Sequence, residues 1–325
     1  MSWIQITDFD RANGWGNAAD AEARARRYCE QLEEGKILYF DQAPFELPAE
    51  ECEFLRTQKQ SGLAIFKNVS YRPKPDLITG AAKDDPLNIA RLHQIMRDFS
   101  RRAVEFADRF LLPYADRRQI DYASFRPVEE QNRNLPLHKR NDLVHIDSFH
   151  TRPTNGGRIL RIFTNINPKQ NRVWQICEPF EPLAHKLANE AGLRKYAAGA
   201  YSPVRKLRRT FAPIFRTIGV RGIDRSPYDQ FMLHFHDWLK ESRDYQEGST
   251  KERLEFPPGS AWMVYTDTVP HAVVSGQFAL EQTLIVPIEA MVVPRVSPLR
   301  VLEGMCGRRW RIERIIDSNQ PSRDS

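Results

Sequence analysis

The stretch from Leu143 to Ser148 places a histidine and an aspartate two residues apart within an otherwise apolar run. Side chains two apart on a β-strand point to the same face, so we expect His145 and Asp147 to converge while Val144 and Ile146 face the other way. Taken alone, this pattern is more typical of a half-exposed strand whose aspartate forms an ion pair than of a metal site. The rest of the chain must therefore decide between a structural and a chemical role.

A second histidine that could join this pair is His271, in Asp267-Thr-Val-Pro-His271, 126 residues further along (271 − 145). Two imidazoles and one carboxylate suit a divalent first-row metal and leave three coordination positions open, as in non-haem Fe(II) sites. His150 is an alternative third ligand, but a loop so close to Asp147 would close the open face. The other histidines considered are expected to be structural or at a rim: His138, His234 and His236.

Short strands punctuated by Gly, Pro and Asn are predicted in two parts of the chain, residues 121–180 and 255–290. A helical insert at 181–250 separates them. Ligands from early and late strands that meet at a barrel mouth are typical of a double-stranded β-helix, the jelly-roll or cupin-like core. We therefore predict an α+β fold with this core.

The N-terminal region, residues 1–120, is predicted to add helices and short strands in front of that core. Its clearest helix opens at Asp85-Pro86, where aspartate is a good N-cap and proline suits the first helical position, and it stops at Pro113. A short strand is also predicted at Leu63–Phe66. We expect one catalytic domain over 1–325, with a polar, disordered tail at 316–325.

Charge and cysteine usage limit the classes of partner and compartment. The chain has 48 Lys and Arg against 42 Asp and Glu, a net charge of +6, which is too small an excess to indicate nucleic-acid binding. Four widely spaced cysteines fit free thiols in a reducing cytosol. The N-terminal residues lack the basic and apolar runs of a signal peptide, so a cytoplasmic location is expected.

Much of the positive charge falls in the insert, where Val204–Arg216 alternates cations with bulky apolar residues. Such a segment is typical of a helix that docks at an anionic membrane surface. A solvated basic helix that packs Phe211 and Phe215 inward explains the pattern equally well. Both interpretations stay open.

If the metal works with 2-oxoglutarate, the far carboxylate of that molecule needs a cation, and a bidentate arginine fits best. The short strand after His271 offers only Glu281-Gln-Thr283 at the expected place. Arg161 is the better candidate because its neighbours on the same strand face, Ile159 and Phe163, are apolar and favour an inward position. Arg158 is expected at the rim. Arg126 and Arg172, at strand ends, are further candidates for 2-oxoglutarate or an anionic substrate.

Several longer strings resemble bacterial Kdo hydroxylases, which act on the 3-deoxy-D-manno-octulosonic acid (Kdo) of lipopolysaccharide. The strings are Ile37–Phe40, Val144-His-Ile-Asp-Ser-Phe-His150, Asp267–His271 and Leu302-Glu-Gly-Met-Cys-Gly-Arg-Arg309. The resemblance implies Fe(II), 2-oxoglutarate and O₂ as cofactors, with iron on His145, Asp147 and His271 and 2-oxoglutarate on Arg161. It also implies hydroxylation of Kdo at C3, giving Ko, on the glycolipid Kdo₂–lipid A.

Two rival interpretations remain. One is a cupin-type metal enzyme, an isomerase or a hydrolase, that uses the same three ligands without 2-oxoglutarate. The absence of an arginine soon after His271 is its best support. The other is a non-catalytic protein that binds lipid A. The oligomeric state, including a homo-oligomer, is left open by the sequence.

Overall fold

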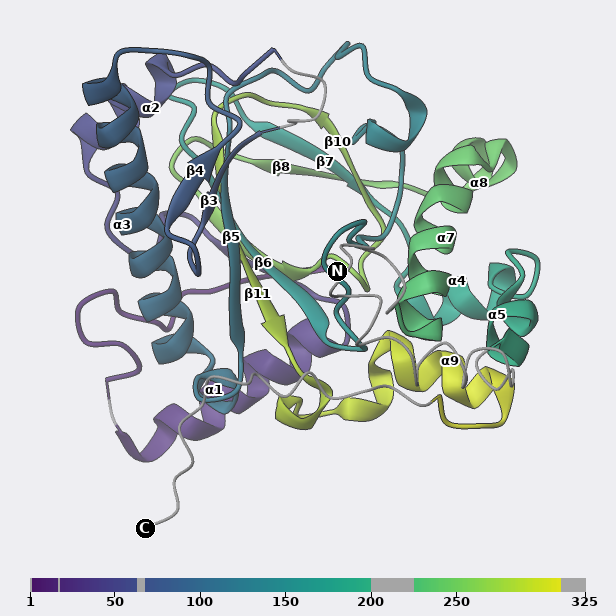
Figure 1. Ribbon diagram of the computed structural model, residues 1–325. Helices are drawn as coiled ribbons and strands as arrows, with labels where there is room; N and C mark the ends of the chain where they lie inside the picture. The colour runs from purple at the N-terminus through teal and green to yellow at the C-terminus, as the bar shows by residue number, and fades with distance from the viewer. Residues whose placement is uncertain (1, 17, 63–67, 200–224, 311–325) are drawn as a thin grey trace, which may run out of the picture.

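The computed structural model describes residues 2–16, 18–62, 68–199 and 225–310 (Figure 1). Its largest element is a sheet of eight strands, antiparallel except where β1 runs parallel to β2. In spatial order the strands are β1 (Trp3–Gln5), β2 (Ile37–Phe40), β9 (Ala261–Tyr265), β6 (Arg158–Asn165), β11 (Ala279–Val286), β5 (Gln119–Arg126), β3 (Val69–Arg72) and β4 (Leu77–Thr79). The N-terminal region thus contributes both edges of the sheet.

A second, antiparallel sheet lies against the inner face of the first. It consists of β10 (His271–Ser275), β7 (Arg172–Ile176) and β8 (Glu252–Phe256). Aromatic rings fill part of the space between the sheets: the Phe163 ring centroid is 4.9 Å from that of Trp174 and 5.2 Å from that of Trp262. Side chains on these strands alternate between the two faces, because Phe163 and Trp262 point inward while Leu160 and Met263 join the core on the other face.

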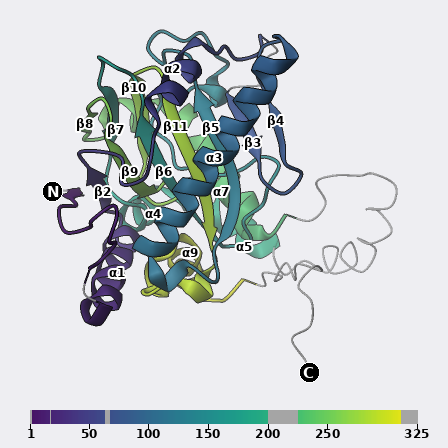
Figure 2. The ribbon, with the colours of Figure 1, turned by 90° about the vertical axis from the view of Figure 1, so that its left-hand side faces the viewer.

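Helices cover the outer face of the large sheet. The two that pack on it are α1 (Ala18–Glu33), against β2 and β9, and α3 (Pro86–Phe110), which crosses β3, β5 and β11 (Figure 2). The predicted start of α3 is confirmed, since the Asp85 side chain accepts a hydrogen bond from the Leu87 amide at 2.7 Å and Pro86 occupies the first helical position. Two further helices are α2 (Ala49–Thr57) and α9 (Pro298–Cys306).

The insert between β7 and β8 is helical where the structure describes it. Its helices are α4 (Phe180–Leu187), α5 (Leu193–Gly199), α7 (Pro227–Glu241) and α8 (Arg243–Gly248). Short 3-10 turns lie at Leu112–Tyr114, Leu137–Lys139, Ile288–Ala290 and Pro294–Val296. The basic segment 204–216, the strand expected at 63–66 and the tail at 316–325 lie outside the described residues.

The α+β class predicted from the sequence is confirmed, and the structure corrects one element within it. Residues 143–147 form no regular strand, because the one bridge that they make with other described residues is that between His145 and His271. The division into one catalytic domain stays a prediction. Within the ranges that the structure describes, no helix combines the length and the apolar character needed to span a bilayer.

Candidate metal centre

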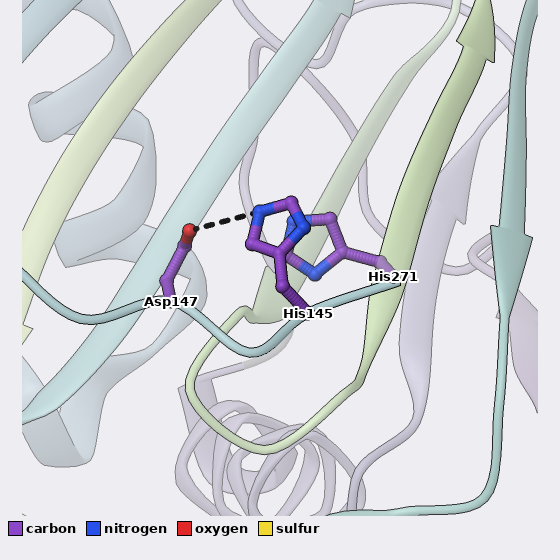
Figure 3. A group of neighbouring side chains, drawn as sticks. All are labelled: His145, Asp147 and His271. Carbon is purple, nitrogen blue, oxygen red and sulfur yellow. Dashed lines mark ion pairs between the residues drawn. The ribbon is translucent and has the colours of Figure 1, made fainter. Parts of the chain in front are cut away.

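His145, Asp147 and His271 meet at one point, as expected (Figure 3). One ligand atom from each side chain lies within 4.8 Å of the others, and His145 Nε2 is 3.7 Å from Asp147 Oδ1. Both histidines are buried, at 4% exposure. The predicted alternation also holds, since Val144 and Ile146 are buried in the apolar core on the other side.

Backbone hydrogen bonds bring these residues together from distant parts of the chain. The His145 amide donates to the His271 carbonyl at 3.1 Å, and the His271 amide donates back at 2.9 Å. The Asp147 amide then donates to the Thr266 carbonyl, just beyond the end of β9, at 2.8 Å. The segment that carries His145 and Asp147 therefore lies beside the end of β9 and the start of β10 but does not form a regular β-ladder with either strand.

Hydrogen bonds fix the tautomer of each histidine. A carbonyl oxygen can only accept, so Nδ1 of His145 must donate to the Leu143 carbonyl at 2.7 Å, and Nδ1 of His271 to the Val269 carbonyl at 2.9 Å. Each Nε2 then keeps its lone pair and is available as a metal ligand. The His271 ring also stacks on Trp174, with centroids 4.8 Å apart and planes 17° apart, which restrains its orientation.

The charge states of the three residues suit a metal. Burial lowers the pKa of His145 well below its ordinary value, and burial likewise lowers the pKa of His271 against the opposing charge of Asp147. Burial by itself would raise the pKa of Asp147, but the Arg161 guanidinium and His271 hold it below its usual range. Two neutral imidazoles and one carboxylate are the donor set of a three-ligand iron site with open positions.

Arg161 is largely buried on β6, as its apolar neighbours predicted. Its Nε lies 3.1 Å from Asp147 Oδ2, and its Nη1 donates to Glu281 at 2.6 Å. Glu281 also accepts from Arg126, whose Nε is 3.0 Å away. In the sequence, Glu281 marks only a position where an arginine is missing, yet it is the carboxylate that joins two of the three candidate arginines.

Arg172, the third candidate, begins β7 and is fully buried. Its Nη1 donates to the Gly276 carbonyl at 3.1 Å, and Nη2 is 3.6 Å from Glu130. Among the described residues, neither its Nε nor its Nη2 has an acceptor at hydrogen-bonding geometry. Burial lowers the pKa of Arg172 to about 10, although Glu130 opposes this. Arg172 is thus a buried guanidinium with unused donors, linked through Glu130 to Arg126.

The expectation that Arg158 lies at the rim is wrong. Its side chain is fully buried, its Nε is 2.9 Å from Asp267, and it also hydrogen-bonds to Thr268. Arg158 does face away from Arg161, but that opposite face is covered by the core, so the guanidinium needs a buried partner. The pair holds the turn between β9 and His271.

Sequence reasoning missed Glu281, Glu130 and Gln246. For Glu281 a signal existed, because a carboxylate inside an apolar strand is rarely buried without a cation. His236 was assigned a structural role, and its ring lies 5.0 Å from that of His145. The alternative ligand, His150, is exposed and does not belong to the converging group.

With this geometry established, comparison with known proteins decides the family. The model of the 3-deoxy-D-manno-oct-2-ulosonic acid (Kdo) hydroxylases matches residues 15–309. The chain belongs to the Kdo hydroxylase family. The resemblance inferred from the sequence strings is thereby confirmed. Among curated proteins, none matches this chain.

Solved structures of a Kdo hydroxylase, KdoO, described as a non-heme Fe(II) alphaketoglutarate dependent dioxygenase, are similar over nearly the whole chain. One in complex with alphaketoglutarate and Fe(III) is 31% identical, covers 95% of this chain and 97% of its own, and has a TM-score of 0.77. One with cobalt(II) is 31% identical, with coverage of 99% and 100% and a TM-score of 0.78. One with succinate and Fe(III) is 30% identical, with the same coverage and a TM-score of 0.77.

Proposed function

We propose that this protein is an Fe(II)- and 2-oxoglutarate-dependent dioxygenase that hydroxylates Kdo. The observation that carries the proposal is the convergence of two Nε2 lone pairs and one carboxylate, His145, Asp147 and His271, in a chain that belongs to the Kdo hydroxylase family. KdoO, which is similar over the full length, has been solved with Fe(III) and alphaketoglutarate. The same chemistry here would need these three residues as iron ligands.

The residues of this chain would prepare the site before chemistry begins. Arg161 keeps Asp147 ionised, and the carbonyls of Leu143 and Val269 hold the two imidazoles in the ligating tautomer. Burial of both histidines keeps bulk water from the ligand atoms. When bound, iron and 2-oxoglutarate supply the oxidising power that converts a C–H bond to C–OH with O₂. The protein's part is to bind, orient and exclude water.

For the far carboxylate of 2-oxoglutarate we propose Arg161, with Arg126 and Arg172 as the alternatives. Arg161 stands nearest to the ligands, 3.1 Å from Asp147, but both of its neighbours are carboxylates. Arg172 has the spare buried donors. Substituting each by lysine separately, and comparing the KM for 2-oxoglutarate, will identify the anchor: a bidentate arginine cannot be replaced by a point charge without loss.

We further propose Kdo₂–lipid A as the substrate, with C3 hydroxylation giving Ko, at the cytoplasmic face of the inner membrane. Support comes from the family and from the basic composition of 204–216. Charge reversal of Arg205, Arg208 and Arg209 is expected to reduce co-sedimentation with anionic vesicles. Unchanged co-sedimentation would contradict membrane docking.

We assign the two-sheet core to the double-stranded β-helix class. Its support is the placement of the candidate ligands: His271 opens a strand of the smaller sheet, while Asp147 hydrogen-bonds next to the end of β9 in the larger sheet. A metal held where two facing sheets approach each other is typical of that class.

The direct test is succinate formation from 2-oxoglutarate by Fe(II)-loaded protein when O₂ is admitted, with and without Kdo₂–lipid A. Turnover that depends on the glycolipid and is lost in His145→Ala is the expected result. Iron binding without any consumption of 2-oxoglutarate would contradict the proposal and favour a cupin-type enzyme with the same ligands.

A further inference from the structure

The segment that carries His145 and Asp147 bonds along one edge to the backbone of His271 and Thr266. Side chains from the helical insert form hydrogen bonds to its other edge. We propose that Gln246 of α8 and His236 of α7 are positioning residues that hold the ligand segment in the geometry required for metal binding. This inference rests on the proposed function, because it assigns a task to residues outside the three candidate ligands.

Gln246 binds the backbone of Val144 as a neighbouring strand would. Its Oε1 accepts from the Val144 amide at 2.9 Å, and its Nε2 donates to the Val144 carbonyl at 2.8 Å. The same Nε2 donates to the Leu239 carbonyl at the end of α7, at 2.7 Å. One carboxamide thus satisfies both backbone groups of the residue before His145 and fixes its own orientation through a third bond.

His236 binds the next carbonyl on the same side. Its Nδ1 lies 2.6 Å from the carbonyl oxygen of Ile146, the residue between the two candidate ligands. Because that oxygen can only accept, Nδ1 carries the proton. His236 is 6% exposed, and its ring stands edge-on to His145 with centroids 5.0 Å apart. The contact therefore fixes the peptide between the ligands and packs against one of them.

The hydrogen bonds of the segment alternate as in a strand at the centre of a sheet. His145 and Asp147 bond through three backbone groups to His271 and Thr266. Val144 and Ile146 bond through three others to Gln246 and His236. A segment with a single isolated bridge is thus held on both edges, one by backbone and one by side chains.

Loss of the side-chain edge would leave only the bonds to His271 and Thr266. The backbone of residues 144–146 would then be free to shift, and His145 and Asp147 would spread over more orientations. Metal affinity is sensitive to such supporting contacts, which are typically worth about 10- to 100-fold in affinity. The prediction is therefore weaker metal binding in a protein that still folds.

The test measures cobalt(II) binding to the full-length protein by calorimetry, together with the visible spectrum of the bound ion, which reports its coordination geometry. Gln246→Leu removes both bonds to Val144 and is expected to weaken binding by about 10-fold or more and to alter the spectrum. The matched control is Gln230→Leu, a glutamine on the same insert whose side-chain amide donates to the Arg225 carbonyl. It is expected to leave both readouts unchanged.

A second pair of variants separates positioning from general packing. His236→Leu removes the donor to Ile146, whereas His236→Asn can place an amide nitrogen where Nδ1 lies. Weakened binding in His236→Leu that is rescued in His236→Asn supports the proposal, and this pair decides the question if Gln246→Leu does not fold. Affinity and spectrum equal to wild type in both folded Gln246→Leu and His236→Leu would overturn it.

Failure of the proposed metal site gives a different result. Cobalt(II) binding that is unaffected by His271→Ala would show that the ion sits elsewhere, which overturns the proposed function and this inference with it. Binding that is lost in His271→Ala but unchanged in Gln246→Leu and His236→Leu overturns the positioning role alone.

Discussion

The space between the two sheets has an apolar half and a charged half, and neighbouring inward positions of one strand belong to different halves. Phe163 of β6 packs with Trp174 and Trp262. Arg161, two residues earlier on the same face, pairs with Asp147 and Glu281. The apolar half joins the sheets by contact area, which tolerates small changes of shape. The charged half joins them by buried ion pairs, in which loss of one charged side chain leaves its partner without a counter-charge.

The two halves meet at His271, which stacks on Trp174 and has a ring nitrogen within 4.8 Å of a carboxylate oxygen of Asp147. The apolar half thus restrains the orientation of the His271 ring, and the charged half contains the candidate ligand Asp147. If this division is correct, conservative substitutions will have very different effects in the two halves.

The largest effect on stability is expected from Glu281→Gln. It keeps the shape of the side chain but leaves the buried cations Arg126 and Arg161 without their shared carboxylate, which should lower the free energy of unfolding by about 3 kcal/mol or more. Urea unfolding provides the measurement. As control, Glu255→Gln removes an exposed partner of Arg253 and should change little. Equal stability of Glu281→Gln and wild type would contradict the dependence on pairing.

The next effect is a loss of stability in acid. Burial lowers the pKa of His145 and His271, and that of His236 to about 3, so the native protein keeps all three neutral where the unfolded chain is protonated. The free energy of unfolding therefore keeps its full value above the pKa of histidine in the unfolded chain, about 6.5. Below that pH it falls by about 1.4 kcal/mol per histidine per pH unit.

Metal-free protein unfolded in urea at pH 7.5, 6.5 and 5.5 will show this slope. Asparagine cannot take up a proton, so His236→Asn should reduce the slope of unfolding free energy against pH by the contribution of one histidine. A flat profile down to pH 5.5 would mean that the native histidines bind protons as readily as the unfolded ones.

The smallest effect is expected in the apolar half. Phe163→Leu keeps an apolar side chain against Trp174 and Trp262 and should lower the free energy of unfolding by only about 1 kcal/mol, with metal binding retained. Thermal unfolding with and without cobalt(II) will measure both. A loss as large as that of Glu281→Gln would remove the distinction between the two halves.

Local rules predicted much of this molecule. The N-cap and proline at Asp85-Pro86 mark the start of α3, and the period of two in residues 143–147 predicts that His145 and Asp147 share a side. Both signals depend on geometry within a few residues, so tertiary structure did not alter them.

Features that depend on partners distant in the chain could not be predicted in this way. Residues 143–147 have strand-like alternation without a strand, because one edge bonds to helix side chains rather than to a backbone. For Arg158, the alternation of a strand predicts which side of the sheet the side chain faces, but it does not predict what packs against that side. The sequence therefore suggests a rim position for a residue that is in fact buried. Glu281 became a partner of Arg161 only through the register that pairs Phe163 with Glu281.

The fate of the two oxygen atoms of O₂ tests directly whether this protein is a Kdo dioxygenase. Fe(II)-loaded protein would be incubated with 2-oxoglutarate and Kdo₂–lipid A under isotopically labelled O₂, and the glycolipid and succinate analysed by mass spectrometry. We expect one labelled oxygen atom in the Kdo unit and one in succinate, with both signals absent in His271→Ala. An unmodified glycolipid, or an added oxygen that comes from water, would contradict it.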